Sequence, residues 1–181
     1  MVIPDRTEHV FGLDEIILRQ ATEADLPLLE WEGEYANYRR LYLEVFQRTL
    51  RDCAAMWVAT DYNNRMLGQM FVQLSSHQID LADGYFRAYM FGFRVKKKYR
   101  CMGIGTLLLL RTEKDLIDRN FQRVCLNVAK NNWRARQLYE RHGYQVLHED
   151  PGEWSYQDNN GTWHDIAEPA WRMEKQVVRI K

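Results

Sequence analysis

The sequence lacks the features that mark membrane proteins, disulfide-linked domains and nucleic-acid-binding proteins. None of its apolar runs approaches the roughly 20 residues that a helix needs to cross a bilayer. Cys53, Cys101 and Cys125 are widely spaced and form no CxxC pair, and no histidine cluster has ligand spacing, so neither a disulfide framework nor a metal site is predicted. With 25 basic and 25 acidic residues the formal net charge is zero, which excludes a global basic field for nucleic acid or an anionic membrane.

What is present is a chain of ordinary globular size. A chain of 181 residues is long enough to bury a core without cross-links, and we expect a single domain over residues 1–181. The first 15 residues, MVIPDRTEHVFGLDE, mix charged with apolar side chains and lack the continuous apolar stretch of a secretory leader. The sequence therefore predicts a soluble, cytoplasmic protein with no nucleic-acid, membrane or metal partner.

The first half of the chain carries the patterns of a strand, two helices and a hairpin. Residues 16–20 form a strand candidate, and Thr22, followed three residues later by Asp25, resembles a capping box that opens a helix through LPLLEW. The spacing predicts a second helix over residues 38–55. Its apolar face would hold Leu41, Val45, Phe46 and Leu50. Residues 56–60 and 66–74 flank the turn DYNN and are expected to form a hairpin.

The second half alternates strands with helices and ends in two strands. We expect strands at 85–95 and 123–129, and helices from Gly105 to about Asn120 and over 132–143, the last with Asn132 at its start and Gly143 at its end. Two final strands, 144–149 and 170–177, are separated by a polar, aromatic-rich connection that contains the hairpin-type turn DNNG. This order predicts a mixed α/β (α+β) fold in which the βαβ step requires a parallel or crossover pairing.

The stretch RVKKKYRCMGIGT, residues 94–106, has the composition of an anion-binding loop. The first amides of a helix have no acceptor within it, and together with the positive end of the helix dipole they bind phosphate-like groups. Gly103 and Gly105 let an anion approach the backbone. The basic side chains of Lys96, Lys97, Lys98 and Arg100 add local attraction, about 1 kcal/mol or less each while exposed. A tight turn beside a solvated basic edge explains the same residues equally well.

The glycine spacing decides which phosphate motif fits. Walker A needs a Gly-Lys pair that is absent, and a dinucleotide fingerprint starting at Gly103 would need glycine where the sequence has Leu108. The remaining pattern, R-x-x-G-x-G from Arg100 to Gly105, resembles [QR]-x-x-G-x-[GA], the acetyl-CoA pyrophosphate loop of the GNAT superfamily of N-acetyltransferases. The family places a hydrophobic residue five positions earlier, and Val95 is there.

A second motif of the same family follows in register. Its pattern is L-x-V-x-x-x-N-x-x-A-x-x-L-Y-x-x-x-G-[FY]. The matching residues are Leu126, Val128, Asn132, Ala135, Leu138, Tyr139, Gly143 and Tyr144. The resemblance covers residues 85–146 in detail. It implies a GNAT fold, with a mixed, mostly antiparallel sheet of about six or seven strands, the fourth and fifth splayed apart, and about four flanking helices.

The resemblance also implies roles for individual residues. The pyrophosphate of acetyl-CoA would be held by the loop residues Arg100, Cys101, Met102, Gly103, Ile104, Gly105 and Thr106. The pantetheine arm would pair with the main chain of Phe93 and Val95, and the Phe93 amide would stabilise the oxyanion. Tyr139 would protonate the departing thiolate. Asn132 would cap its helix and bond the cofactor, although a cap alone is a sufficient explanation for it. Gly92, inside the strand, is consistent with a bulge or a close approach.

The general base and the acceptor are less defined. Many family members carry a glutamate at the position of Tyr89, but residues 85–95 contain no carboxylate, so the base would be water, a residue from another element, or Tyr89, whose unperturbed pKa of about 10 suits it poorly. Candidates by chemistry alone are Glu32, Glu34, His77 and His148. Residues 31–35 and 152–171 are rich in aromatics and carboxylates and predict a cationic acceptor, a small cationic amine or a peptide amino group. Packing aromatics beside a solvated hairpin explain these residues equally well.

Three functional classes are compatible with the sequence. The first is an acetyl-CoA-dependent N-acetyltransferase in which the amine attacks the thioester directly. The second is an acyl-CoA-binding regulatory module without catalysis, suggested by the missing carboxylate. The third, a nucleotide-binding enzyme, is disfavoured by the failed phosphate motifs. The sequence does not decide whether two protomers pair as a homodimer through the last strands.

Overall fold

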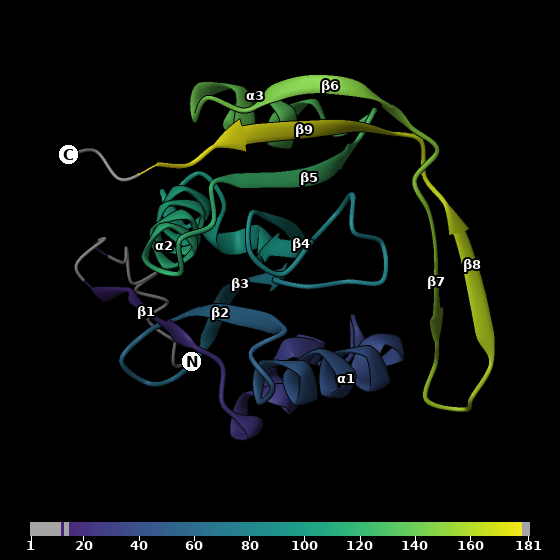
Figure 1. The fold of residues 1–181 in the computed structure, drawn as a ribbon. Helices are drawn as coiled ribbons and strands as arrows, with labels where there is room; N and C mark the ends of the chain where they lie inside the picture. The colour runs from purple at the N-terminus through teal and green to yellow at the C-terminus, as the bar shows by residue number, and fades with distance from the viewer. Residues whose placement is uncertain (1–11, 13–14, 179–181) are drawn as a thin grey trace, which may run out of the picture.

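A computed structural model describes residue 12 and residues 15–178 of the chain (Figure 1). Its centre is a seven-stranded sheet in the order β1-β2-β3-β4-β5-β9-β6. Only β4 and β5 run parallel among these neighbours. The strands are β1 Ile17–Gln20, β2 Ala54–Thr60, β3 Met66–Gln73, β4 Arg87–Val95, β5 Arg123–Ala129, β6 Gln145–Asp150 and β9 Ala170–Gln176. The predicted mixed, mostly antiparallel sheet is confirmed.

Helices cover both faces of the sheet. The α-helices are α1 Arg39–Thr49, α2 Ile104–Asp118 and α3 Trp133–Arg141, and the 3-10 helices are η2 Glu23–Glu30, η3 Ala36–Tyr38 and η4 Lys97–Tyr99. On one face, α1 and η2 enclose a core that includes Leu29, Tyr42 and Phe71. On the other face, α2 and α3 bury a second core that includes Leu108 and Tyr139. The sheet therefore separates two hydrophobic cores.

Two predicted helices differ from the structure. The first, opened by Thr22, is a 3-10 helix, and its interior Pro27 has no amide to donate to a helical bond. Its predicted capping pair is present, since the Thr22 amide donates to the Asp25 carboxylate at 2.7 Å. The second, expected over residues 38–55, ends at Thr49. Leu50, placed in the core by the helical pattern, is 73% exposed, and β2 begins two residues earlier than predicted.

The connection expected between the last two strands is itself a β-hairpin. Strands β7 Glu153–Gln157 and β8 Trp163–Ala167 pair with each other and not with the main sheet. The DNNG turn joins them, and the Asp158 carboxylate accepts the amides of Asn160 and Thr162 at 2.8 and 3.0 Å. The hairpin runs from the β6 and β9 end of the sheet down to α1 (Figure 1). It therefore covers one side of the molecule (Figure 1).

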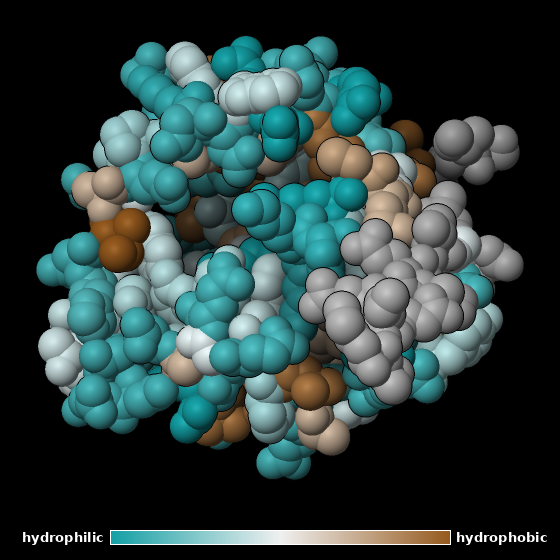
Figure 2. Space-filling view, turned by 180° about the vertical axis from the view of Figure 1, so that it is seen from behind, coloured by the Kyte–Doolittle hydropathy of each residue, from teal (hydrophilic) through white to brown (hydrophobic). Residues whose placement is uncertain are grey.

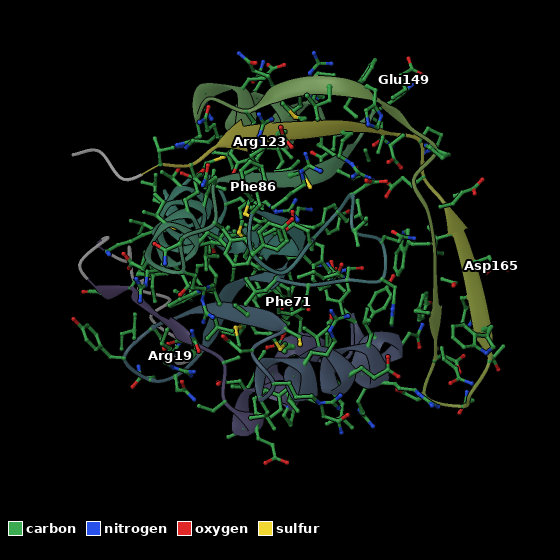
Figure 3. All side chains as sticks on the ribbon, in the orientation of Figure 1. Arg19, Phe71, Phe86, Arg123, Glu149 and Asp165 are labelled. Atoms are coloured by element: carbon green, nitrogen blue, oxygen red, sulfur yellow. The ribbon has the colours of Figure 1, made fainter. Side chains whose placement is uncertain are left out.

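A bulge at Gly92 divides β4 into two parts. The register shifts where Gln69 pairs with Arg94 but Phe71 pairs with Phe91, and Gly92 has φ +59°. A Cβ at this glycine would lie 2.6 Å from the Cδ2 of Phe71, which sits mid-sheet (labelled in Figure 3). The predicted bulge and close approach are both confirmed. Because the extra residue breaks the alternation of faces, Phe93 packs on the α2 core while Arg94 turns to the α1 side.

The predicted helix ends are confirmed. Asn120 follows α2 with φ +67°, and Gly143 follows α3 with φ +86°. Within the described part of the chain, no helix is long and apolar enough to span a membrane.

Candidate active site

Strands β4 and β5 separate halfway along their length and leave a cleft. Their pairing stops at Met90 and Leu126, beyond which each strand lacks a neighbour on that side. The cleft has a volume of about 450 Å³. Its lining residues are Met90, Phe91, Gly92, Phe93, Arg94, Asn127, Val128, Ala129, Asn131, Asn132, Ala135, Tyr139 and Glu168. The space-filling view from behind shows a hollow in the upper half of the molecule, rimmed mostly by hydrophilic residues (Figure 2).

Main-chain amides of β4 point into this cleft. The Lys96 amide donates to the Leu67 carbonyl of β3 at 2.9 Å. Amide direction alternates along a regular strand, so the amide of Val95, next to Lys96 and beyond the bulge, is expected to point the other way, toward the open side that faces β5. An extended ligand in the cleft can therefore bind β4 as an added strand does.

The loop after β4 presents a row of amides at the start of α2. The Arg100 Nε donates to the Val95 carbonyl at 3.0 Å, and Cys101 and Gly103 take φ values of +63° and +83°. The Leu107 amide bonds the Gly103 carbonyl at 3.0 Å. In the described residues, the amides of 101–106 have no acceptor in the protein, which makes the predicted anion site available.

Two of the lysines in this stretch have partners in the protein. Lys96 Nζ binds the Glu32 carboxylate at 2.6 and 2.9 Å, and Lys98 Nζ lies 4.8 Å from the centroid of the Tyr99 ring. A Cβ at Gly105 would meet the Cζ of Phe93 at 3.2 Å, so α2 approaches β4 closely only with glycine there. The predicted anion site therefore depends on the backbone amides of the loop more than on these two lysines.

Tyr139 lines the cleft from α3. Its side chain is only 6% exposed, and its ring centroid lies 6.2 Å from that of Phe93 and 5.6 Å from that of Tyr144. No hydrogen-bond partner of its hydroxyl is found among the described residues. Burial, and to a lesser degree the neighbouring Tyr89, raise the pKa of this hydroxyl well above its usual value. The group therefore keeps its proton at neutral pH and can donate it to a ligand.

Asn132 caps α3, as its position predicts. Its Oδ1 accepts the Ala135 amide at 3.2 Å, and the residue also lines the cleft.

Replacing Asn132 with alanine is expected to lower the free energy of unfolding by about 0.5–2 kcal/mol, because a helix amide loses its acceptor. Asn132→Asp preserves the cap and serves as the control. Denaturant unfolding measures both variants, and an alanine variant as stable as the parent would contradict the capping role.

Tyr89 does not have the environment of a base. Burial raises the pKa of its hydroxyl to about 12, and the nearby charge of Arg172 only partly opposes this. The Arg172 guanidinium lies 5.5 Å from the Tyr89 ring centroid and also binds Asn127 and Asp150, at 2.5 and 2.6 Å. Burial alone would raise the pKa of Asp150, but the Gly152 amide and Arg172 outweigh it and lower that pKa. Asp150 is thus held as a paired anion.

The structure leaves the four candidates named by chemistry outside the cleft lining. Glu32 is paired with Lys96, and Glu34, His77 and His148 are exposed. Among the described residues, Glu168 is the one carboxylate in the cleft lining, and the sequence did not single it out. It stands just before β9, whose Ala170 pairs with Ala129 at the end of β5. Only this long-range pairing brings Glu168 to the cleft, and no local sequence signal marks it.

The fold is similar to that of solved N-acetyltransferases. The structure resembles Ard1 from Thermoplasma volcanium with a TM-score of 0.69 and 17% identity, covering 91% of this chain and 99% of that one. It resembles the ribosomal-protein-S18-alanine N-acetyltransferase from Escherichia coli with a TM-score of 0.66 and 19% identity, covering 92% of this chain and 96% of that one. It also resembles the spermidine N-acetyltransferase from Vibrio cholerae, in complex with CoA and spermine, with a TM-score of 0.65 and 16% identity, covering 91% of this chain and 96% of that one.

The sequence also identifies the family. The model of the acetyltransferase (GNAT) family matches residues 19–144. The chain belongs to this family.

Proposed function

We propose that the protein transfers an acetyl group from acetyl-CoA to a primary amine. The observation that carries this proposal is the unpartnered Tyr139 hydroxyl in a cleft that Phe93 lines from the unpaired part of β4. A thioester bound between them would have an oxyanion donor on one side and a proton donor on the other.

Backbone groups along the cleft and its neighbouring loop match successive parts of acetyl-CoA. The amides of residues 101–106 would hold its pyrophosphate, the Val95 main chain would pair with its pantetheine amide, and the Phe93 amide would donate to its acetyl carbonyl. The solved spermidine N-acetyltransferase with CoA supports a nucleotide of this kind in this fold.

The reaction then runs by direct attack. The neutral amine forms a bond to the acetyl carbon, and the carbonyl electrons move to the oxygen that the Phe93 amide stabilises. The C–S bond breaks as the intermediate collapses, and the thiolate takes the Tyr139 proton. Tyr139 regains a proton from solvent, which has received the one lost by the amine.

Glu168 is our candidate for the group that receives the proton of the amine. It is the carboxylate in the cleft lining, and Tyr89, with its pKa of about 12, cannot be an anion at neutral pH. Glu168 is exposed to solvent, so it can also pass the proton on. This supplies the base that the sequence of β4 lacks.

The acceptor is proposed to be a small amine or a peptide amino group. Both kinds occur in the names of the structural relatives, a spermidine N-acetyltransferase and a ribosomal-protein-S18-alanine N-acetyltransferase. The argument for a cationic acceptor, however, loses part of its support, because Glu32 is already paired with Lys96.

A regulatory module that binds acyl-CoA without catalysis is the alternative. The Tyr139 hydroxyl argues against it, since a sensor has no use for a buried proton donor without a partner. Turnover in an assay of CoA-thiol release across amines and amino-terminal peptides decides between the two.

Acetyl-CoA is expected to raise the unfolding temperature, whereas ATP and NAD are not. A ligand that binds only the native state adds about 2.7 kcal/mol at one hundred times its Kd. Gly105→Val should abolish the shift, because a larger side chain would collide with Phe93 and displace the loop. Gly161→Ala in the distant hairpin turn is the control, and an equal shift with ATP would contradict the proposed ligand.

A further inference from the structure

Two of the groups expected to receive a cationic acceptor already contact other groups of the protein. The Trp31 Nε1 donates to the Gln69 side chain at 3.1 Å, and its indole is 5% exposed. Lys96 Nζ lies 5.8 Å from the Trp31 ring centroid while it binds both oxygens of Glu32. The site therefore does not offer this tryptophan or this carboxylate to an incoming cation.

A different charged group, Arg94, stands at the cleft. The guanidinium carbon lies 4.2 Å from the ring centroid of Tyr35 and 5.3 Å from that of Tyr38, and Nη1 donates to the Tyr42 hydroxyl at 3.1 Å. Within the part of the chain that the structure describes, no carboxylate forms an ion pair with Arg94, whose guanidinium always carries its charge. Arg94 is thus a fixed, half-buried cation in the cleft lining without a protein anion.

Aromatic side chains of the β7–β8 hairpin pack against Tyr38, one of the rings that contact Arg94. The Tyr38 ring centroid lies 4.7 Å from that of Tyr156 and 6.1 Å from that of Trp154, both on β7. At the hairpin tip, Asn159 Nδ2 donates to the Ala36 carbonyl at 2.8 Å. These contacts join η3, α1 and β7 on the side of β4 to which the Gly92 bulge turns Arg94.

The physical consequence is a preference for one sign of charge. A guanidinium has five donors, and Tyr42 occupies one, so donors remain for a two-point contact with a carboxylate. The aromatic rings fix the guanidinium, which lowers the entropy lost on binding. A second cation at the same place would be repelled.

We propose that the acceptor carries a carboxylate on the same molecule as its amine, and that Arg94 binds this carboxylate. The inference rests on the proposed function and specifies its substrate class. Glu168 and Arg94 line the same cleft, so a zwitterion such as an amino acid would meet an anion for its ammonium group and a cation for its carboxylate.

The test compares acceptors that differ only at the carboxylate. Amino acids, including ω-amino acids, are assayed beside their carboxamides, which keep the amine and lose the charge. We expect at least one acid to exceed its amide by about 10- to 100-fold in kcat/KM, the range of a charge-assisted hydrogen bond. Arg94→Gln should remove the preference and leave the affinity for acetyl-CoA unchanged.

Arg111→Gln is the matched control. The Arg111 guanidinium stacks 4.2 Å from the Trp57 ring centroid but does not line the cleft, so this variant loses a similar contact and should keep the preference. Amides that react as well as every acid, or a preference that survives Arg94→Gln, would overturn the inference.

The two proposals fail separately. If acetyl-CoA binds and no acceptor of either kind is acetylated, the proposed function fails. The inference is then decided by the thermal shift of the CoA-saturated protein with each acid and amide pair, and equal shifts would overturn it.

Discussion

Replacing Tyr139 with phenylalanine is expected to lower kcat by about 10²- to 10⁴-fold, the range that a general acid contributes. The ring remains against Phe93, so the packing of α3 is kept and only the proton is lost. Acetyl-CoA binding should be unchanged, because the amides of β4 and of the loop do not depend on this hydroxyl. Release of CoA thiol measures the first quantity, and calorimetric titration with acetyl-CoA measures the second.

Tyr144→Phe separates this role from a loss of stability. The Tyr144 ring packs on Tyr139, but its hydroxyl donates to Glu113 at 2.9 Å on the core side. Its removal leaves a buried carboxylate with one partner fewer, which should cost about 1–3 kcal/mol of stability while kcat is preserved. Equal turnover in Tyr139→Phe and the parent would refute the acid role.

The pH profile gives an independent readout of Tyr139. Burial raises the pKa of its hydroxyl, and an acid with a raised pKa stays protonated to higher pH. Ionisation of this group should therefore not depress kcat as the pH approaches about 10, the unperturbed value of tyrosine.

Glu168→Gln is the second change with a large expected effect. The amide keeps the shape of the side chain but cannot accept a proton, so kcat/KM at neutral pH should fall by about 10²-fold or more if deprotonation is shared with no other group. At higher pH, where more of the amine is already neutral, the deficit should shrink. The parent and the variant are compared by acetyl transfer from pH 6 to pH 9, a range of about 3 units around neutrality.

Asp165→Asn is the matched carboxylate control. Asp165 stands on β8, three residues earlier in the chain and outside the cleft lining (Figure 3). It should behave as the parent at every pH. A constant deficit for Glu168→Gln across the pH range would assign Glu168 a binding role and exclude it as the base.

The sequence predicted the parts of the site that lie close together along the chain. The loop 100–106, the cap at Asn132 and the tyrosine at 139 belong to two short motifs whose letters specify a helix start and one face of a helix. Local geometry is enough for these, because each group is positioned by its own helix. The glycine at 92 was also readable, since a glycine inside a strand marks a bulge.

The parts that were missed depend on pairing between distant segments. Glu168 reaches the cleft only because β9 pairs with β5, and the hairpin β7–β8 was taken for a connection because its strands are short and largely exposed. No role was predicted for Arg94, because the alternation of faces does not show that the bulge turns this side chain to the α1 side. Periodicity alone does not reveal which face a residue serves beyond a break in register.

At Gly92, the residues of β4 that face the α2 core change from even-numbered to odd-numbered. Before it, even-numbered Ala88 and Met90 face the α2 core; after it, odd-numbered Phe93 and Val95 do. One extra residue, and not a second strand, accounts for this change from even to odd numbers. Deleting Gly92 would restore an uninterrupted alternation, in which Phe93 stays on the face of Ala88 and Met90 and Arg94 stays on the opposite face. The strand would then pair with β3 without a shift in register and lose the local bend and extra twist that a bulge adds.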